Sequence, residues 1–264
     1  MRSHELTDYN RKAWDHLAQN ENEWTVPVSR ETIERARQGD WKIVLTPEKP
    51  IPSQWLGPVA GSDILCLAGG GGQQAPILAA AGANVTTLDN SPAQLQRDRE
   101  VAEREGLKIT TVLGQMDDLY ELANETFDLI VHPCSNCFAP DIRPVWNEAF
   151  RVLRPGGHLL SGFNNPVRYL FDYFEMQKGN LIVKHKIPYS DFDHMPQAKL
   201  QKLIDNNEPL EFGHTLTDQI GGQIDAGFVI SGMYEDHWNI PEEPLSQYLA
   251  VFIATRATRP EIQA

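Results

Sequence analysis

The sequence predicts an α/β fold with a mostly parallel sheet, and three observations predict it. From residue 62 onward, short apolar segments typical of strands alternate with segments typical of helices. Such alternation is characteristic of βαβ units, whose strands run parallel. The first strand leads directly into four consecutive glycines, Gly69 to Gly72. At 264 residues, of which 41% are hydrophobic, the chain is long enough to bury a full core.

The expected elements follow in a regular order. Two helices, near 6–19 and 29–38, precede an extended linker. Strands are then predicted over 63–67, 84–88, 108–113, 127–132 and 157–163. Helices are predicted between them over 73–81, 91–105, 117–122 and 141–153. Ser91 and Pro92 mark one helix start, because an N-cap serine followed by proline at the first helical position is a common beginning. The tail predicts a helix over 215–228 and strands over 229–235 and 248–258.

This order divides the chain into four parts. Residues 1–60 form a tryptophan-rich helical segment, and residues 61–163 form the first part of the core. Residues 164–214 are mixed, aromatic and polar, and this stretch is too long for an ordinary connection. We therefore expect a small inserted cap over the carboxyl edge of the sheet. Residues 215–264 add a last helix and the last two strands.

The composition and charge of the chain limit the classes of partner and cellular environment that we expect. A formal net charge of −13 disfavours nucleic acid, whose binding needs a basic face. No apolar run approaches the roughly 20 residues that span a bilayer, and the first residues lack an apolar signal core. Three cysteines are too few, and odd in number, for a disulfide framework. We expect a cytoplasmic protein with reduced thiols and a small-molecule substrate.

The glycines predict a nucleotide-like ligand. They follow a strand and precede a helix, where a glycine turn lets a ligand approach the backbone. Asp89 ends the next strand, 19 residues after Gly70, and a carboxylate there is placed to accept hydrogen bonds from ribose hydroxyls. Gly70-x-Gly72-x-x-Ala75 also fits the dinucleotide fingerprint, so an NAD-dependent oxidoreductase is an alternative. A P-loop is excluded, since no Lys-Ser/Thr pair follows the glycines.

Several ordered segments together resemble the class I S-adenosylmethionine-dependent methyltransferases over residues 62–256. They are ILCLAGGGG, GQMDDL, FDLIVH, EAFRVLRPGGHLL and IDAGFVISGMYED. The resemblance implies a Rossmann-like, doubly wound, seven-stranded sheet with helices on both faces and an antiparallel last strand. It also implies in-line SN2 transfer of a methyl group to an O, N, S or C atom of a small molecule. A non-catalytic cofactor-binding protein of the same fold is a further alternative.

The resemblance assigns cofactor-binding residues. Gly70 and Gly72 fill the family's glycine turn. Asp89 and Asn90 are expected to contact the ribose of the cofactor. Met116 is expected to pack on the adenine face, and Asp117 to contact the exocyclic amine of the adenine. Tyr9 and Trp14 lie in a first helix that resembles the family's cofactor-covering helix; their rings either close over the methionine end or anchor this segment to the sheet. Two residues depart from the family pattern: Cys66 stands where an acid is usual, and Ala68 where the first glycine is usual.

Candidate acceptor-side residues lie at strand ends and in the cap. His132 ends the fourth predicted strand, and an imidazole is suited to general-base work; it would equally fix the loop backbone or touch the cofactor. Asn136 either orients an acceptor or caps a turn. Tyr189 and His214 are candidate substrate contacts, with core packing as the alternative. We expect no metal site at Cys134 and Cys137, because a zinc site needs about four ligands and the sequence has no second cysteine pair.

Overall fold

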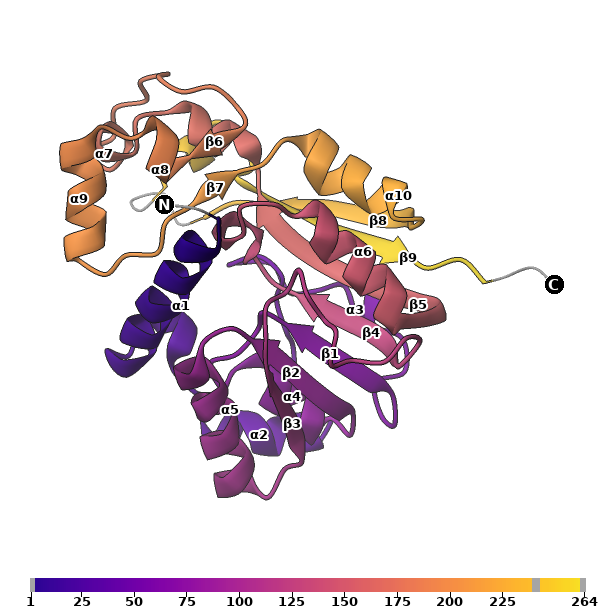
Figure 1. The fold of residues 1–264 in the computed structure, drawn as a ribbon. Helices are drawn as coiled ribbons and strands as arrows, with labels where there is room; N and C mark the ends of the chain where they lie inside the picture. Colours follow the sequence, from indigo (N-terminus) through magenta and orange to yellow (C-terminus); the bar gives the residue numbers. More distant parts are fainter. Residues whose placement is uncertain (1–2, 239–242, 262–264) are drawn as a thin grey trace.

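A twisted sheet runs through the middle of the protein (Figure 1). The computed structural model describes residues 3–238 and 243–261. In these ranges the seven strands of the sheet are β1 (Asp63–Leu67), β2 (Asn84–Asp89), β3 (Ile109–Leu113), β4 (Phe127–His132), β5 (Leu153–Asn164), β8 (Val229–Asp236) and β9 (Phe252–Thr258).

The strand order creates a reversal point between β1 and β4. The order across the sheet is β3-β2-β1-β4-β5-β9-β8, and β9 alone runs antiparallel to its neighbours. This confirms the expected mostly parallel sheet with an antiparallel last strand. After β1 the chain adds β2 and β3 on one side and returns to place β4 on the other. The loops after β1 and β4 therefore diverge and leave a crevice at the carboxyl ends.

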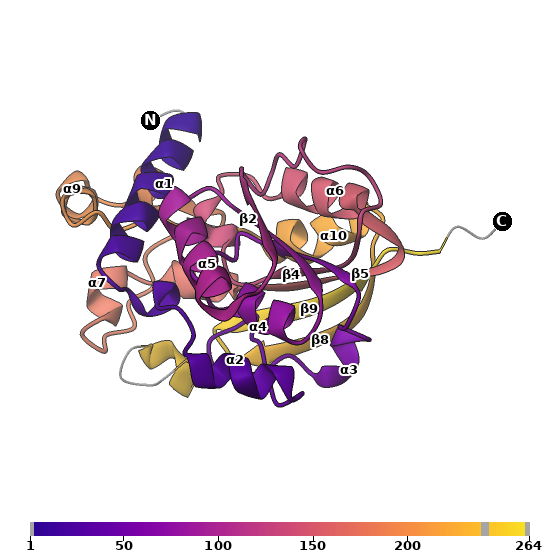
Figure 2. The same cartoon turned by 90° about the horizontal axis from the view of Figure 1, so that it is seen from below.

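Helices bury both faces of the sheet (Figure 2). On one face lie α2 (Arg30–Arg37), α3 (Ser53–Leu56) and α4 (Gln74–Ala80), with α5 (Pro92–Glu105) packed beside α4. On the other lie α6 (Arg143–Val152) and α10 (Gly222–Asp225). Successive strand residues point to opposite faces, so β1 needs apolar residues throughout.

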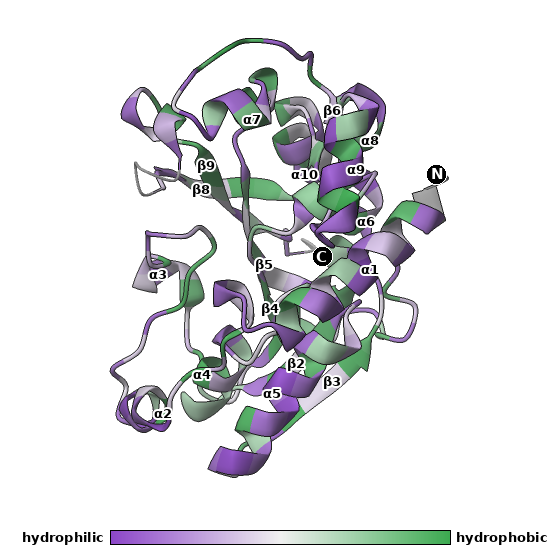
Figure 3. Cartoon of the chain, turned by 90° about the vertical axis from the view of Figure 1, so that its left-hand side faces the viewer, coloured by the Kyte–Doolittle hydropathy of each residue, from purple (hydrophilic) through white to green (hydrophobic). Residues whose placement is uncertain are grey.

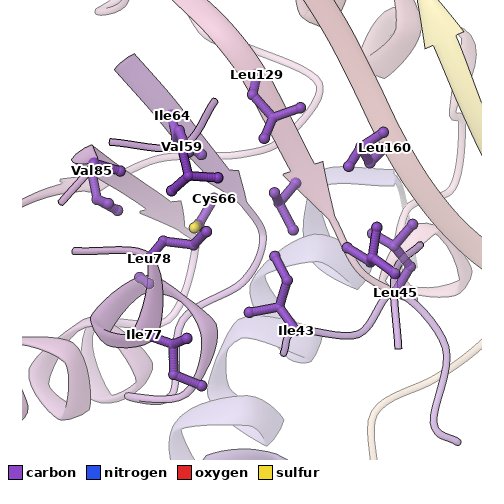
Figure 4. Close-up of a cluster of buried hydrophobic side chains, with 14 of the residues drawn as sticks. Ile43, Leu45, Val59, Ile64, Cys66, Ile77, Leu78, Val85, Leu129 and Leu160 are labelled. Carbon is purple, nitrogen blue, oxygen red and sulfur yellow. The ribbon is translucent and has the colours of Figure 1, made fainter. Parts of the chain in front are cut away.

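The core under α4 includes the thiol of Cys66. Ile64 and Cys66 of β1 pack with Leu78 of α4 in this cluster, as Figure 4 shows. The alternate residues Leu65 and Leu67 belong to the opposite cluster, around the buried Trp146. Cys66 is thus a core side chain, and burial raises the pKa of its thiol. It supplies no charge to the neighbouring loop.

The inserted residues form a layer of short elements above one end of the sheet (Figure 1). Its elements are the 3-10 turn η3 (Pro166–Leu170), the helices α7 (Tyr173–Met176), α8 (Asp191–His194) and α9 (Gln197–Asp205), and the strand pair β6 (Tyr189–Ser190) and β7 (Phe212–Gly213). A further 3-10 turn, η2 (Asn136–Phe138), lies in the loop after β4. The small core of this layer includes Leu200, Leu203 and Phe212.

Helix α1 (Ser3–Gln19) lies beside α9 and closes the gap between this layer and α5 (Figures 1 and 3). Its apolar Leu6 joins the core of the inserted layer. The amide of Asn10 is buried and bridges the parts: Nδ2 donates to the carbonyls of Leu210 (2.9 Å) and Phe138 (3.2 Å), and Oδ1 accepts from the Leu210 N–H (2.8 Å). A short 3-10 turn, η1 (Glu23–Thr25), follows.

Three predictions of local structure need correction. Residues 117–122 form turns rather than a helix, because the Leu119 N–H donates to Glu148 Oε2 (2.7 Å) instead of to a helical carbonyl. The linker predicted as extended contains α3, whose Trp55 packs against Tyr234 of β8 with ring centroids 5.3 Å apart. The helix expected over 215–228 begins with a π-helical turn, η4 (Thr217–Gly221), before α10.

The 3-10 turn η5 (Pro244–Gln247) precedes β9.

Over the described ranges, no helix has both the length and the apolar character that crossing a membrane requires.

We expect Gly162→Ala to destabilise the protein. Gly162 lies in β5 directly beneath Leu45, and an added methyl group would collide with the Leu45 carbonyl oxygen and lie 2.7 Å from its carbon. Displacing this backbone should cost about 1–3 kcal/mol, which lowers the melting temperature by at least about 2 °C. Thermal unfolding of Gly221→Ala is the matched control, because its methyl would meet only Thr217 Cγ2, at 3.7 Å. Equal melting temperatures for the two variants would contradict this packing argument.

Candidate functional site

A cavity of about 480 Å³, the main cavity, opens at the carboxyl ends of the parallel strands. Its floor consists of Ala68 to Gly70 after β1, Asp89 and Asn90 after β2, Gly114 to Asp117 after β3, Pro133 to Ser135 after β4, and Asn164 at the end of β5. Trp14 of α1, the segment 44–47 and residues of the inserted layer such as Tyr173 complete its wall. This position, at the reversal of strand order, is where open α/β sheets bind ligands.

A smaller cavity of about 100 Å³, the cap cavity, lies within the inserted layer. It shares part of its wall with the main cavity: Arg168, Tyr173, Glu208, Pro209 and Glu211 line both. The two cavities are therefore neighbours, one at the strand ends and one in the inserted layer, on either side of these shared residues.

Three of the four glycines, Gly70 to Gly72, are required by contacts within the protein. A Cβ on Gly70 would lie 2.8 Å from Gln94 Cβ, and one on Gly71 would lie 2.7 Å from the Trp24 carbonyl oxygen. Gly72 has φ +73°, and its Cβ would lie 3.0 Å from the Arg97 carbonyl oxygen. The loop is thus pressed between α5 and η1. Gly70 lines the main cavity, whereas Gly72 is turned away from it, toward α5.

Ala68 is a further wall residue of the main cavity. Its φ of +47° lies in the left-handed region, and its N–H donates to the Leu88 carbonyl (2.8 Å). This conformation costs a non-glycine residue about 1 kcal/mol. The position where the family pattern has glycine therefore retains the conformation that glycine favours, although its side chain is a methyl group.

Asp98 organises the glycine loop, and sequence reasoning missed it. Its side chain is fully buried, and Oδ1 accepts a hydrogen bond from the Gly72 N–H (3.1 Å). Burial, reinforced by the nearby Asp89, raises the pKa of Asp98 well above its usual value. The sequence signal was available, because Asp98 occupies an inward position of α5, three residues from both Leu95 and Val101. A carboxyl group from α5 thus takes over the role expected of an acid at Cys66.

Asp89 holds the other side of the loop. Its Oδ2 accepts from the Gly70 N–H (3.0 Å), and its Oδ1 accepts from the Ser91 N–H (2.9 Å). The residue is only 8% exposed, and it lies in the wall of the main cavity. Burial raises its pKa to about 6, against the opposing effect of these hydrogen bonds. Asn90, Met116 and Asp117 line the same region, and burial also raises the pKa of Asp117.

His132 has a structural position. It is fully buried and is not part of the wall of either cavity. Its Nδ1 lies 2.9 Å from the Leu67 carbonyl oxygen, and its Nε2 lies 2.7 Å from Asn136 Oδ1. Burial lowers its pKa, and the two oxygen atoms beside its ring nitrogens oppose this shift. Both nitrogens already have protein partners, so this placement does not support a general base and favours the alternative, a histidine that fixes the loop.

Asn136 and His214 extend this buried polar network. Asn136 Nδ2 donates to Gln219 Oε1 (2.9 Å), which links the loop after β4 to the π-helical turn. His214 Nε2 lies 2.9 Å from the Ala139 carbonyl and 3.1 Å from the Asn136 carbonyl. Neither residue lines either cavity, so the structure gives both of them loop-holding contacts rather than substrate contacts.

The predicted aromatic residues have separate positions. Trp14 lines the main cavity and packs edge-on against Phe138, with centroids 5.1 Å apart. Tyr9 instead donates its hydroxyl to the Glu208 carbonyl (2.9 Å) and so anchors α1 to the inserted layer. Tyr189 lines the cap cavity, where it stacks on Tyr169 at 5.6 Å. The hydroxyl of Tyr9 thus anchors α1, and Trp14 lies at the main cavity, where its covering role stays a prediction.

Cys134 and Cys137 both line the main cavity. Burial raises the pKa of both thiols, so they are protonated at neutral pH. Among residues 3–238 and 243–261, no three His, Cys, Asp or Glu side chains come together in an arrangement that could hold a metal ion.

Comparisons with known proteins agree with this geometry. The family model described as "Methyltransferase domain" matches residues 65–161. The chain is 54% identical over 254 residues to the uncharacterized methyltransferase YbaJ of Bacillus subtilis, an alignment that covers 96% of this chain and 98% of that protein. A similar fold is found in an S-adenosylmethionine-dependent methyltransferase from Mesorhizobium loti, with TM-score 0.59 and 20% identity over 78% of this chain and 94% of that one.

A geranyl diphosphate methyltransferase, solved in complex with S-adenosylmethionine, also has this fold. Its TM-score is 0.53 at 16% identity, covering 78% of this chain and 82% of that one.

We expect Asp98→Ala to lower the free energy of unfolding by about 1–3 kcal/mol, because the buried Gly72 N–H would lose its acceptor. Asp98→Asn keeps an oxygen at the same place and should lose clearly less. Urea unfolding of the two variants, followed by circular dichroism, measures the difference. If alanine and asparagine were equally tolerated, the hydrogen bond to Gly72 would not be what stabilises the loop.

Proposed function

Since the chain belongs to the class I S-adenosylmethionine-dependent methyltransferases, we propose that it transfers the methyl group to a small molecule enclosed beneath the inserted layer. The observation that carries this proposal is the main cavity, which lies between the strand-end loops and wall residues from α1 and the inserted layer, such as Trp14 and Tyr173. A cavity walled in this way suits a compact acceptor better than a macromolecule. Neither the oxidoreductase nor the non-catalytic alternative is supported by the relatives, which are named methyltransferases.

The residues present fit S-adenosylmethionine. A volume of about 480 Å³ lies within the range of pockets for ligands of this size. We propose that Asp89, with Asn90, binds the ribose, that Met116 and Asp117 contact the adenine, and that Gly70 and Ala68 let the methionine part approach the backbone. All six residues line the main cavity. The bound sulfonium supplies an electrophilic methyl group.

The protein's own contribution is alignment and exclusion of water. Gly70, held by Asp89, fixes the loop beside the cofactor, and Trp14 covers it. A rigid floor of this kind places two reactants in line, which is the main catalytic requirement of an SN2 transfer. We propose that His132 contributes indirectly, by tying the loop after β4 to the Leu67 carbonyl. Gly72 contributes in the same way, through Asp98.

The composition bears on the class of acceptor and on the cellular location. The formal net charge of −13 favours a small-molecule acceptor over nucleic acid. We propose a cytoplasmic enzyme on the basis of its sequence.

The test measures binding and turnover. Calorimetric titration should give binding of S-adenosylmethionine and no binding of NADH. Incubation with methyl-labelled cofactor and a metabolite extract should then label small molecules. Total RNA and total protein, offered separately, should stay unlabelled. Label in either macromolecule and not in the metabolites would refute a small-molecule acceptor.

We expect cofactor binding to weaken at low pH. Ribose hydroxyls donate hydrogen bonds, so they favour the ionised carboxylate of Asp89, whose pKa is about 6 in the free protein. Ionisation is complete above this pKa and is lost as the pH falls through it, so the Kd should rise about tenfold between pH 7.5 and pH 5. Asp89→Asn should bind more weakly and with a flatter pH profile. An unchanged profile in this variant would assign the titration to another group, such as Asp117.

A further inference from the structure

We propose that the methyl acceptor is an amine that carries a positive charge in solution, and that it binds where the main and cap cavities meet. This inference rests on the proposed function and names its substrate class. The region in question, here called the acceptor chamber, is bounded by Asn164, Arg168, Tyr173, Glu208, Glu211 and Asp191.

The charge of the acceptor chamber is negative. Glu208, Glu211 and Asp191 contribute carboxyl groups, and Arg168 is the only cation among the described wall residues of the two cavities. Arg168 is already engaged. Its Nε donates to Glu243 Oε2 (2.6 Å), and its Nη1 donates to Glu211 Oε2 (3.2 Å). One guanidinium thus faces several carboxylates, and the excess charge favours a cationic ligand.

Two side chains of the acceptor chamber, Asn164 and Glu211, offer hydrogen-bond acceptors. Tyr169 has one hydroxyl hydrogen, which it donates to Glu211 Oε2 (2.6 Å). Its oxygen must therefore accept from Asn164, whose Nδ2 lies 2.6 Å away. This fixes the orientation of the Asn164 amide and leaves Oδ1 as an acceptor in the cavity wall. Asn164 lines the main cavity, so this oxygen can accept a hydrogen bond from a ligand there.

The second open acceptor is on Glu211. Its Oε2 is occupied by Tyr169 and Arg168, and its side chain is 30% exposed at the junction of the two cavities. Its remaining oxygen, Oε1, can receive an N–H from a bound ammonium group. Like the Tyr169 hydroxyl, the Tyr189 hydroxyl uses its hydrogen within the protein, because it donates to Asp191 Oδ1 (2.8 Å).

Aromatic and apolar side chains complete the chamber. Tyr173 lines both cavities, and Phe171, Met176 and Leu203 line the cap cavity. Aromatic rings beside carboxylates suit a cation, because the ring face carries partial negative charge. The apolar residues favour an amine that carries a hydrocarbon or aromatic group. A carboxylate or phosphate acceptor would meet like charges without a free cation to pair with.

The reaction balances with the groups present. The ammonium acceptor gives one proton to a chamber carboxylate, which we assign to Glu211, and the freed lone pair then takes the methyl group. A nitrogen–carbon bond forms, the sulfur–methyl bond breaks, and its electron pair stays on sulfur. The products are a methylated ammonium ion, the demethylated cofactor and one proton, which Glu211 passes to solvent.

The test separates metabolites by charge. A small-molecule extract is divided on a cation exchanger at pH 7 into retained and unretained pools, and each is incubated with the full chain and methyl-labelled S-adenosylmethionine. We expect label in the retained pool only. Label in the unretained pool, alone or alongside, overturns the amine assignment while leaving the methyltransferase function intact. No label in either pool overturns both, and calorimetric binding of the cofactor then shows whether the loss lies in the cofactor site or in the acceptor.

Variants locate the effect in the acceptor chamber. With the labelled pool as substrate, Glu211→Gln should raise KM about 10–100-fold, since it removes a hydrogen bond to a charged group. It should also lower kcat, since it removes the group that accepts the proton. Glu208→Gln, outside the Arg168 cluster, should raise KM by a smaller factor. Both should keep the wild-type Kd for S-adenosylmethionine, which also reports correct folding. Glu103→Gln removes one charge from the exposed surface of α5 and should change neither constant. Equal KM values in all three variants overturn the proposal.

Discussion

The structure depends on how one backbone loop is held at the top of β1. Four glycines can adopt many conformations, and ordering them costs entropy. Two carboxyl groups from outside the loop offset this cost: Asp89 at the end of β2 binds the Gly70 N–H, and Asp98 of α5 binds the Gly72 N–H. Both are buried, so neither hydrogen bond is weakened by water. The floor of the main cavity has its shape because these two acceptors are fixed on elements that the sheet itself positions.

Much of the fold could be predicted from sequence, because the sheet is built from local patterns. Each strand is a short apolar run bounded by turn residues, and alternation with helices determines the parallel arrangement. Prediction failed where a distant side chain determines the local backbone. Residues 117–122 lack a helix because Glu148 binds the Leu119 N–H. The linker contains α3 because Trp55 finds a place on β8. Neither contact leaves a signal within its own segment.

The site was predictable to the same degree. Gly70, Asp89, Asn90, Met116, Asp117 and Trp14 all line the main cavity, as expected from their places at strand ends and in the first helix. His132 also ends a strand, yet it points into the core, because residues along a strand alternate between faces and the ends are no exception. Asp98 was missed because an acid on the inward face of a helix reads as an interruption of the apolar pattern. Arg168 and Glu211 were missed because the inserted layer has no periodicity that indicates which side chains meet.

The buried Asn10 amide joins the first helix to Leu210 and to the loop after β4. Leu210 lies 200 positions from Asn10 and Phe138 lies 128, so α1 gains all its anchors only after residue 210 has been made. A nascent chain that has completed β1 to β5 has the floor of the site but no cover for it, and α1 must wait, with its apolar face unsatisfied, until residue 210 has left the ribosome. Premature termination would therefore yield an open floor with an exposed helix, a species suited to capture by chaperones and to degradation. Enclosure of the cavity thus waits for Leu210, which precedes β8 and β9 in the chain.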